Sequence, residues 1–474
     1  TDNNVGVGYQ SLLSATTGAN NTAVGYATLT ANTSGGSNTA VGTNSLDANT
    51  SGSENTAVGW ESLSSNTTAS NNTGIGYKSL RYSTTGSENT ALGHDSGREI
   101  TTGSNNTIMG YRAFSTATTG ANNVAVGTYA LDAQTEGSSS VAIGYNAASG
   151  FTSSQVTAVG SGAVQAATTA NYTVGVGYLA LNYLTTGDHN TAVGFQAMER
   201  TTTGHSCTAM GSYALYNCAT AINNTAFGRS ALGGGAVTGN SNTGVGYFAL
   251  KELTSGAGNV AIGDSALLNC STGTTNTAVG FNTLLSLTTG SNNTCVGDRA
   301  GDAITTAEAN VAIGKSALGA NTTGSNNVAV GKSALTTATT ASNNIAIGIE
   351  ACNVLSTGAE NTIIGTYAGD AITTGSNNTG IGRAALGAAT TSSNNTAVGY
   401  FAALNLTTAS DCTFLGREAG KGVTTGSYNT AIGAESMMGA VTGTANVVVG
   451  RDGLRAITSG SYNVALGNDT NRVN

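Results

Sequence analysis

The chain has few residues that could do chemistry at a site. Its 474 residues include 3 His and 6 Cys. Asp188 and His205 lie 17 residues apart, with His189, Ser206 and Cys207 beside them. Carboxylate, imidazole and thiolate groups brought together could bind a metal ion or respond to pH. The other interpretation, which we favour, is a solvated turn whose composition has drifted.

Nucleophilic catalysis has even less support. No Ser/His/Asp or Cys/His combination occurs at a useful spacing, and no phosphate-binding loop is present. We therefore predict a protein that is not an enzyme, with no catalytic residues, no cofactor and no bound metal.

A repeat must position whatever residues matter, because a glycine recurs at a nearly constant interval. From Gly8 to Gly467 there are 28 such glycines, and 25 of the 27 intervals are 17 residues long. One interval is 16 residues (144–160) and one is 18 (228–246), and local kinks or bulges are expected there. We predict a single array over residues 1–474, with these glycines at structural corners, among them Gly25, Gly42, Gly59, Gly76 and Gly93.

The repeat unit reads approximately N-N-T-A-V-G-Y-x-A-L-x-x-x-T-T-G-S, and we number it from the corner glycine as position 0. Position −1 is apolar and position −3 is Thr, Val or Ile in all 28 copies. This alternation predicts a short strand with one buried face. We expect the Val at −1 and the Leu at +4 to be buried, and a face of Ala and Thr to pack on neighbouring chains.

A unit of 17 residues is too short to fold alone, so the copies must stack. The density of Gly, Thr and Asn disfavours helical repeats. The sequence therefore predicts an all-β fold, a parallel β-solenoid (β-roll) of 28 coils. Each coil would have a strand at −3 to −1, a second extended segment near +2 to +5 and a turn at T-T-G. At about 4.8 Å per coil, the rod would be about 130 Å long.

Position −4 supports stacking, because it is Asn in 23 of 28 copies. Identical Asn side chains in register can hydrogen-bond along a stack as a ladder. The alternative is that Asn only favours turns. We favour the ladder, whose representative rungs are Asn21, Asn38, Asn55, Asn72, Asn89, Asn361, Asn378 and Asn395.

The composition excludes several classes of protein. There are 68 Gly but no Pro and no Gly-X-Y period, so the chain is not collagen. Charged residues make up 8% and the net charge is −8, so no basic surface for nucleic acid is expected. No long apolar run suggests insertion into a membrane. The N-terminus does not read as a signal peptide but as the middle of the pattern, so we expect a fragment or a processed product.

The strand is often written V-A-I-G, as at Val141–Gly144 and Val311–Gly314. This resembles the head repeats of YadA-like trimeric autotransporter adhesins, although those repeats are somewhat shorter. Asn105–Gly110 and Thr373–Gly380 more closely resemble the N-T-A-I-G…T-T-G-S-N repeats of phage tail fibres, which often precede a self-cleaving chaperone of the endosialidase type. No such chaperone domain is present in this sequence. The resemblance implies a left-handed, trimeric, extracellular or virion fibre.

Position +1 is aromatic in 10 of the first 17 coils, and charged residues replace the aromatics later. A position that accepts Tyr, Asp, Lys and Arg is expected to be at least partly exposed. Exposed rings could stack on sugars, and the alternative is packing at a corner or between chains. The candidate glycan-stacking residues are Trp60, Tyr77, Tyr111, Tyr145 and Tyr178.

The six cysteines do not suggest a disulfide framework. Cys207 and Cys412 replace the ladder Asn, while Cys218 and Cys270 share position +7 but lie three coils, about 14 Å, apart. No two cysteines are 17 residues apart. We predict buried free thiols, with cross-linking between chains as the alternative.

Three functions remain. The first is a structural fibre, a homotrimeric shaft or receptor-binding part of a phage tail fibre or virion appendage, with a host cell-surface glycan or receptor as a further partner. The second is a bacterial cell-surface adhesin head or extracellular filament. The third is an ice-binding solenoid, which is disfavoured because the two Thr of T-T-G are adjacent and point in opposite directions.

Overall fold

The structure is a computed structural model that describes residues 3–470, so residues 1–2 and 471–474 of the predicted array lie outside the described residues. Within that range, all the regular elements are β-strands of three or four residues. The chain divides into two compact units, Thr1–Thr238 (unit 1) and Gly239–Asn474 (unit 2), and each unit has its own stack of coils.

The strands of unit 1 are β1 (Val5–Val7), β2 (Thr22–Val24), β3 (Thr39–Val41), β4 (Thr56–Val58), β5 (Thr73–Ile75), β6 (Thr90–Leu92), β7 (Thr107–Met109), β8 (Val124–Val126), β9 (Val141–Ile143), β10 (Val156–Val159), β11 (Thr173–Val176), β12 (Thr191–Val193), β13 (Thr208–Met210) and β14 (Thr225–Phe227).

The strands of unit 2 are β15 (Thr243–Val245), β16 (Val260–Ile262), β17 (Thr277–Val279), β18 (Thr294–Val296), β19 (Val311–Ile313), β20 (Val328–Val330), β21 (Ile345–Ile347), β22 (Thr362–Ile364), β23 (Thr379–Ile381), β24 (Thr396–Val398), β25 (Thr413–Leu415), β26 (Thr430–Ile432), β27 (Val447–Val449) and β28 (Val464–Leu466).

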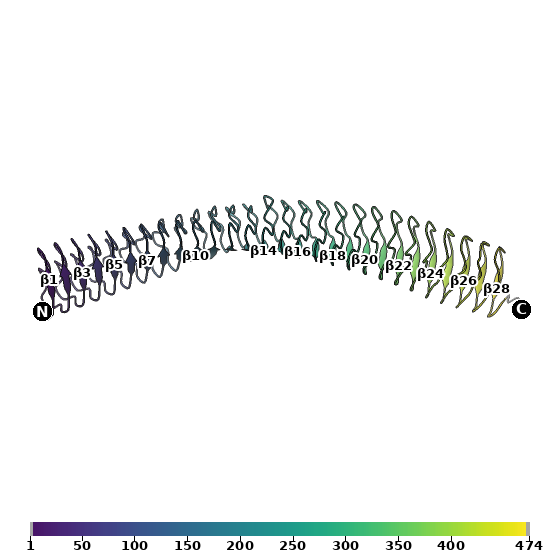
Figure 1. Cartoon of the computed structure of the whole chain (residues 1–474), viewed down its shortest axis with the longest axis horizontal. Helices are drawn as coiled ribbons and strands as arrows, with labels where there is room; N and C mark the ends of the chain where they lie inside the picture. The colour runs from purple at the N-terminus through teal and green to yellow at the C-terminus, as the bar shows by residue number, and fades with distance from the viewer. Residues whose placement is uncertain (1–2, 471–474) are drawn as a thin grey trace. The chain divides into compact units, whose positions relative to one another are not determined.

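Within each unit, strands that follow one another in the chain pair in parallel, with equal repeat positions opposite each other. In β3 and β4, for example, Ala40 lies opposite Ala57 and Val41 opposite Val58. Figure 1 shows the arrows of each unit repeating on the same side of successive coils. The prediction of an all-β parallel solenoid with a 17-residue period is therefore confirmed.

The face of the strand that is buried differs from the prediction. Ala40 at position −2 is fully buried, whereas Val41 at −1 and Thr39 at −3 are not. In β2 and β16, too, the Ala at −2 is buried and the residues at −3 and −1 are not. Alternation along a strand defines two faces but does not say which one is inside. The interior of a coil is narrow, so the small Ala faces inward and the larger branched residues face outward.

Positions +3, +4 and +7 of the same coil are also part of the core. In the third coil Ser45, Leu46 and Asn49 are all fully buried at these positions. The Leu at +4 is buried as the sequence predicts, whereas the sequence does not predict that position +7 belongs to the core. It is hard to recognise because its residues vary from Asn49 to Ile100 and Leu184, all of them fully buried.

The segment after the corner is a series of turns, so the prediction of a second extended segment at +2 to +5 is wrong. Asn44 and Leu46 have φ of 53° and 50°, in the left-handed region that non-glycine residues seldom occupy. Their coil neighbours still satisfy the backbone, because Leu46 N–H donates to Ser62 C=O at 3.1 Å and Ala48 N–H to Ser64 C=O at 3.2 Å. Stacking, rather than strand geometry, supplies the hydrogen bonds here.

The T-T-G segment closes each coil by directing several donors at one acceptor. The backbone N–H groups of Thr33, Ser34 and Gly35 donate to the C=O of Thr50 in the next coil, at 2.9, 3.0 and 3.4 Å. The Thr33 hydroxyl donates to the same oxygen at 3.0 Å. The Thr50 carbonyl thus accepts four donors, which bind this turn to the next coil.

The corner glycines cannot carry a side chain. Gly25 has φ of 141°, and a Cβ built there would lie 2.0 Å from the carbonyl oxygen of Gly42 in the next coil. Both the backbone conformation and the close approach of coils therefore require glycine. The other corner glycines have φ between 119° and 144°.

Volume in the core is balanced within a coil. Where Phe414 replaces the usual Ala at −2, Gly420 replaces the usual Leu at +4. A Cβ on Gly420 would lie 2.0 Å from Cδ1 of Phe414. The ring of Phe414 thus occupies the place of the missing Leu, so the coil keeps its cross-section.

The 16-residue coil keeps its strand pairing. Thr157, Ala158 and Val159 of β10 lie opposite Val141, Ala142 and Ile143 of β9. The deletion falls in the T-T-G turn, where Thr152 N–H still donates to Thr168 C=O at 3.0 Å. The 18-residue coil, residues 228–246, includes the boundary between the two units.

Candidate functional site

Positions −3 and −1 of the strands form an outward surface in each unit, which we call the strand face. No residue at −1 in the 28 described strands is buried. Their exposed fractions include 45% for Met109, 37% for Phe227 and 47% for Leu415. A row of exposed large apolar side chains of this length is unusual on a protein that functions without a partner.

Position −1 of the strand face is apolar in both units, and position −3 is mostly Thr. Its exposed large residues at −1 include Val24, Ile75, Leu92, Met109, Ile143, Met210 and Phe227 in unit 1 and Ile262, Ile313, Ile347, Ile381, Leu415 and Val449 in unit 2. Each pair of adjacent coils repeats the same positions in register, as Val330 beside Ile347 does in β20 and β21. The surface is therefore regular along the stack and suited to a partner with the same spacing.

The aromatic residues at +1 are exposed, and many of them contact each other. Trp60 and Tyr77 stack with ring centroids 4.9 Å apart, and Tyr77 stacks on His94 at 4.5 Å. His94 in turn lies 5.3 Å from Tyr111. Stacking along the coils covers the ring faces and leaves the edges in solvent. A sugar needs a ring face, so Tyr77 is a poor carbohydrate platform.

A cation also covers the rings at the start of this row. The Lys78 ammonium lies 5.0 Å from the Trp60 ring centroid and 4.9 Å from that of Tyr77. Such contacts stabilise a corner by cation–π attraction. These two candidate residues therefore have structural contacts that account for them.

Tyr145 and Tyr178 differ from these rings. Tyr178 stacks on Phe195 at 5.5 Å, so one of its faces is covered. Tyr145 is 57% exposed, the largest fraction among the five candidates. Its neighbours at the same position of adjacent coils, Thr128 and Ser161, are too small to cover a ring. Tyr145 is the candidate with the best-presented ring face.

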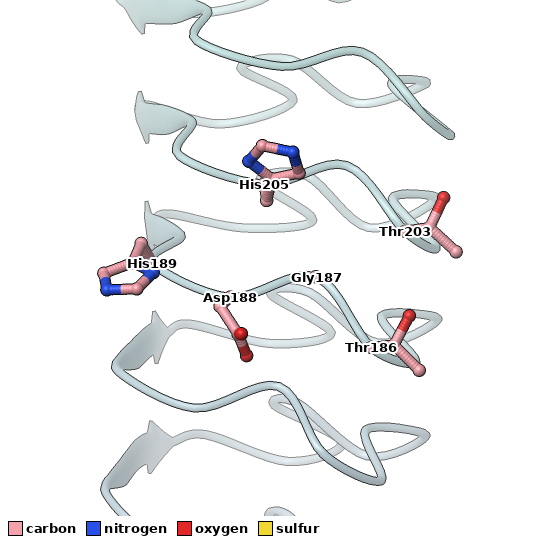
Figure 2. A pocket seen from close by; sticks show the side chains of 6 residues that line it. All are labelled: Thr186, Gly187, Asp188, His189, Thr203 and His205. Carbon is pink, nitrogen blue, oxygen red and sulfur yellow. The ribbon is translucent and has the colours of Figure 1, made fainter.

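Asp188 and His205 line a shallow open hollow of about 260 Å³ with Thr186, Gly187, His189 and Thr203. Their side chains do not converge, because the Asp188 carboxylate and the His205 ring point in opposite directions along the stack (Figure 2). The Asp188 carboxylate accepts the Asn171 backbone N–H at 2.7 Å, and His205 Nδ1 lies 3.3 Å from Ser206 Oγ. Residues 3–470 contain no group of three His, Cys, Asp or Glu side chains that could hold a metal ion.

The asparagines at −4 are buried and connect one coil to the next. Asn38 Nδ2 donates to Asn21 Oδ1 at 3.1 Å and to the Gly52 carbonyl at 2.9 Å. Asn21 Oδ1 also accepts the Asn38 backbone N–H at 2.9 Å. The same contacts recur at Asn55, Asn361, Asn378 and Asn395. Each amide thus satisfies buried polar groups that would otherwise be unpaired.

All six cysteines are buried free thiols, as the sequence predicts. Burial raises the pKa of Cys270 and of Cys412 to about 11, and that of Cys295 to about 12. Burial also raises the pKa of Cys352. Thiols held neutral in this way are unreactive at neutral pH. Cys207 alone has a lowered pKa, because Cys218 hydrogen-bonds to it.

Comparisons with known proteins add no identification, since no family model and no curated protein matches this chain. Across the described residues, no helix has the length and apolar character needed to cross a membrane.

Proposed function

We propose that this chain is a non-enzymatic structural shaft that assembles with two further copies of itself into a homotrimeric fibre. The observation that carries the proposal is the strand face, on which no apolar residue at −1 is buried and many are exposed, as at Ile75, Met109 and Ile347. Removing apolar surface from water stabilises an assembly by about 25 cal/mol per Å². A face repeated in every coil accumulates this gain along the whole shaft.

Copies of the same chain are the partners that fit this face best. Their coils have the same 17-residue period, so apolar rows from different copies meet in register. The side chains are of unequal length, such as Val330, Phe227 and Met210, which suits interdigitation between protein surfaces. Side chains of unequal length do not form the flat surface that would match an ice lattice. The Thr33 hydroxyl at the turn is also already hydrogen-bonded to Thr50 C=O.

The setting that we propose is a phage tail fibre or similar virion appendage, and the alternative is the head of a bacterial cell-surface adhesin or an extracellular filament. Both use a long trimeric shaft, so the strand face supports them equally. Sequence adjoining this shaft separates them, since a chaperone domain accompanies the first and a membrane anchor with a coiled-coil stalk the second. Absence of thermal hysteresis in the purified protein would remove the ice-binding alternative.

Solution mass tests the trimer. Light scattering should give three times the chain mass, and Ile347→Glu with Ile381→Glu should reduce it to one chain, because charges on the strand face would be buried together. Thr357→Glu with Thr391→Glu is the matched control, since these exposed Thr belong to the same two coils and the mass should stay threefold. A wild-type chain that stays monomeric at micromolar concentration would contradict the proposal.

A further inference from the structure

One coil of unit 1 brings two thiols together. Cys207 is at position −4 and Cys218 at position +7 of the same coil. Cys207 Sγ lies 3.5 Å and Cys218 Sγ 3.7 Å from the same acceptor, the carbonyl oxygen of Ala221. Both residues are fully buried. The two sulfur atoms are therefore neighbours inside the solenoid, although 11 residues separate them in the chain.

Side chains at these two positions also meet in regular coils, so the fold itself brings the two cysteines together. In the third coil Asn38 at −4 and Asn49 at +7 donate to the Gly52 carbonyl at 2.9 and 3.0 Å. In coils where both side chains are polar, positions −4 and +7 thus meet at the carbonyl of position +10. The coil from Cys207 to Ala221 is the one in which both positions are Cys.

The pair also differs electrostatically from the other thiols. A hydrogen bond from Cys218 lowers the pKa of Cys207, and the backbone N–H groups of Asn224 and Asn223 lower it further. The same contact with Cys207, together with burial, strongly raises the pKa of Cys218. Cys207 is thus the more acidic of the two thiols, and Cys218 is the one that keeps its proton more tightly.

The surroundings include a polar group with no protein partner. Thr201 is at position +7 of the preceding coil, and its buried hydroxyl has no hydrogen-bond partner in the structure. Side chains at +7 of successive coils touch, as Asn49 Nδ2 does with Asn32 Oδ1 at 2.8 Å. A small polar oxidant at the Cys pair would find a donor there.

We propose that Cys207 and Cys218 are a redox modification site, at which a hydroperoxide converts the two thiols into a reversible disulfide inside a single coil. The Cys207 thiolate attacks one peroxide oxygen, the O–O bond breaks, and water leaves after protonation of the other oxygen. The Cys218 sulfur then attacks the Cys207 sulfenic acid, forming the S–S bond and releasing a second water. Two thiols and one hydrogen peroxide thus give one disulfide and two waters.

The disulfide would add a covalent link within a coil that lacks its ladder Asn. Cys207 stands where an Asn is usual, between Asn190 and Asn224. Closing the loop between positions −4 and +7 restricts the unfolded chain and so stabilises the folded coil. A thiol reductant reverses the reaction by exchange.

Peptide mass spectrometry on the full chain tests the proposal with hydrogen peroxide as the probe. Trypsin cleavage after Arg200 and Arg229 gives one peptide, 201–229, that contains both cysteines. After treatment of the folded protein and alkylation in denaturant, this peptide should be unalkylated and lighter by two hydrogen atoms. Dithiothreitol before alkylation should restore both alkylation sites.

Cys412 and Cys270 are matched controls within the chain, because they occupy positions −4 and +7 without a second Cys. They should remain alkylatable and react at least about tenfold more slowly. Cys207→Asn restores the usual ladder residue and Cys218→Ala introduces the residue found at +7 in Ala117, so both variants should fold and neither should form the disulfide. The proposal fails if both thiols of peptide 201–229 stay alkylatable when the control thiols have reacted, or if Cys207 is found linked to another chain.

Discussion

The asparagine ladder is interrupted in unit 1 and almost continuous in unit 2. Ten consecutive coils of unit 2, from Asn242 to Asn395, have Asn at position −4. In unit 1 three consecutive coils have Ser140, Val156 and Thr173 at this position instead. All three replacements are buried or nearly so, and the coils still stack. The ladder is therefore not what allows the coils to stack.

The strands at the gap explain how the coils manage without the ladder. β10 and β11 are four residues long and begin at Val156 and Thr173, the positions that Asn usually holds. These two residues pair directly through the backbone. In a regular coil the Asn38 N–H donates instead to the Asn21 side chain at 2.9 Å. With Asn at −4 the strand thus begins one residue later, because the Asn side chain takes the place of backbone pairing at that position.

Cysteine is an intermediate case in unit 2. Cys412 Sγ donates to the Gly426 carbonyl at 3.5 Å and accepts the Asn429 backbone N–H at 3.4 Å. These are the contacts that an Asn makes with its Nδ2 and Oδ1 atoms. A thiol keeps the pattern with longer, weaker bonds. A Cys at the ladder position can therefore donate and accept in place of the Asn.

The largest expected effect comes from removing rungs of the continuous ladder. Asn361→Ala, Asn378→Ala and Asn395→Ala together should destabilise unit 2 by several kcal/mol, because each leaves buried donors and acceptors unpaired at about 1–3 kcal/mol apiece. Thermal unfolding followed by circular dichroism, with hydrogen exchange at residues 361–396, measures it.

The control for the triple variant removes three exposed hydroxyls from nearby coils. Thr357→Ala, Thr374→Ala and Thr391→Ala are at position +9 and exposed, so the unfolding midpoint should hardly change. If the two triple variants melt alike, the asparagines act as turn formers only.

A smaller effect is expected at the aromatic corner of unit 1. Tyr77→Ala removes two stacking contacts and a cation–π contact and should cost about 1 kcal/mol, visible as a lower melting midpoint. Tyr145→Ala should leave the midpoint nearly unchanged and should instead lower any signal on a glycan array. Equal array signals for the wild type and the Tyr145 variant would exclude this ring as a sugar platform.

The smallest effect concerns carboxylates at position +5, which both units share. Burial raises the pKa of Asp302 and Asp370 above the usual 3.8 in the folded state. The folded chain then binds protons more tightly than the unfolded chain, so stability falls as pH rises from 3.8 through the raised values. Asp302→Asn with Asp370→Asn should therefore raise stability at pH 7, by about 0.5 kcal/mol or less, because water partly screens these groups.

The pH dependence of the stability gained by the double Asn variant tests whether it comes from removing the buried charges. Urea denaturation at pH 7 and again below pH 3.8 should show the stabilisation at the higher pH only, since the carboxyls are neutral at the lower one. A gain of equal size at both values would assign the effect to packing. Asp47 and Glu199 have raised pKa values for the same reason, so unit 1 should respond in the same direction.

The sequence predicts the period, the strand position and the corner glycine because each follows from a repeated local rule. Gly25 illustrates it, since no other residue fits its φ of 141° and its approach to Gly42. The inward face of the strand does not follow from such a rule. Whether Ala40 or Val41 points inward depends on the width of the coil interior, which is a property of the whole stack.

The turns after the corner are harder still to predict. Leu46 has φ of 50°, a conformation that its local preferences disfavour and that stacking hydrogen bonds impose. The contact between Cys207 and Cys218 cannot be predicted from the sequence for a related reason. The period relates equal positions in different coils, whereas these two residues meet across one coil, and only the path of the chain brings them together.

The bonding of each turn to the next coil has a mechanical consequence. Because the hydrogen bonds of Thr33, Ser34 and Gly35 all end on Thr50, a pulling force can detach one coil without loosening the coil beyond it. Extension would then proceed as a series of equal steps, each releasing about 60 Å of contour length from one repeat. Under tension the coils would therefore unfold one at a time, at a nearly constant force.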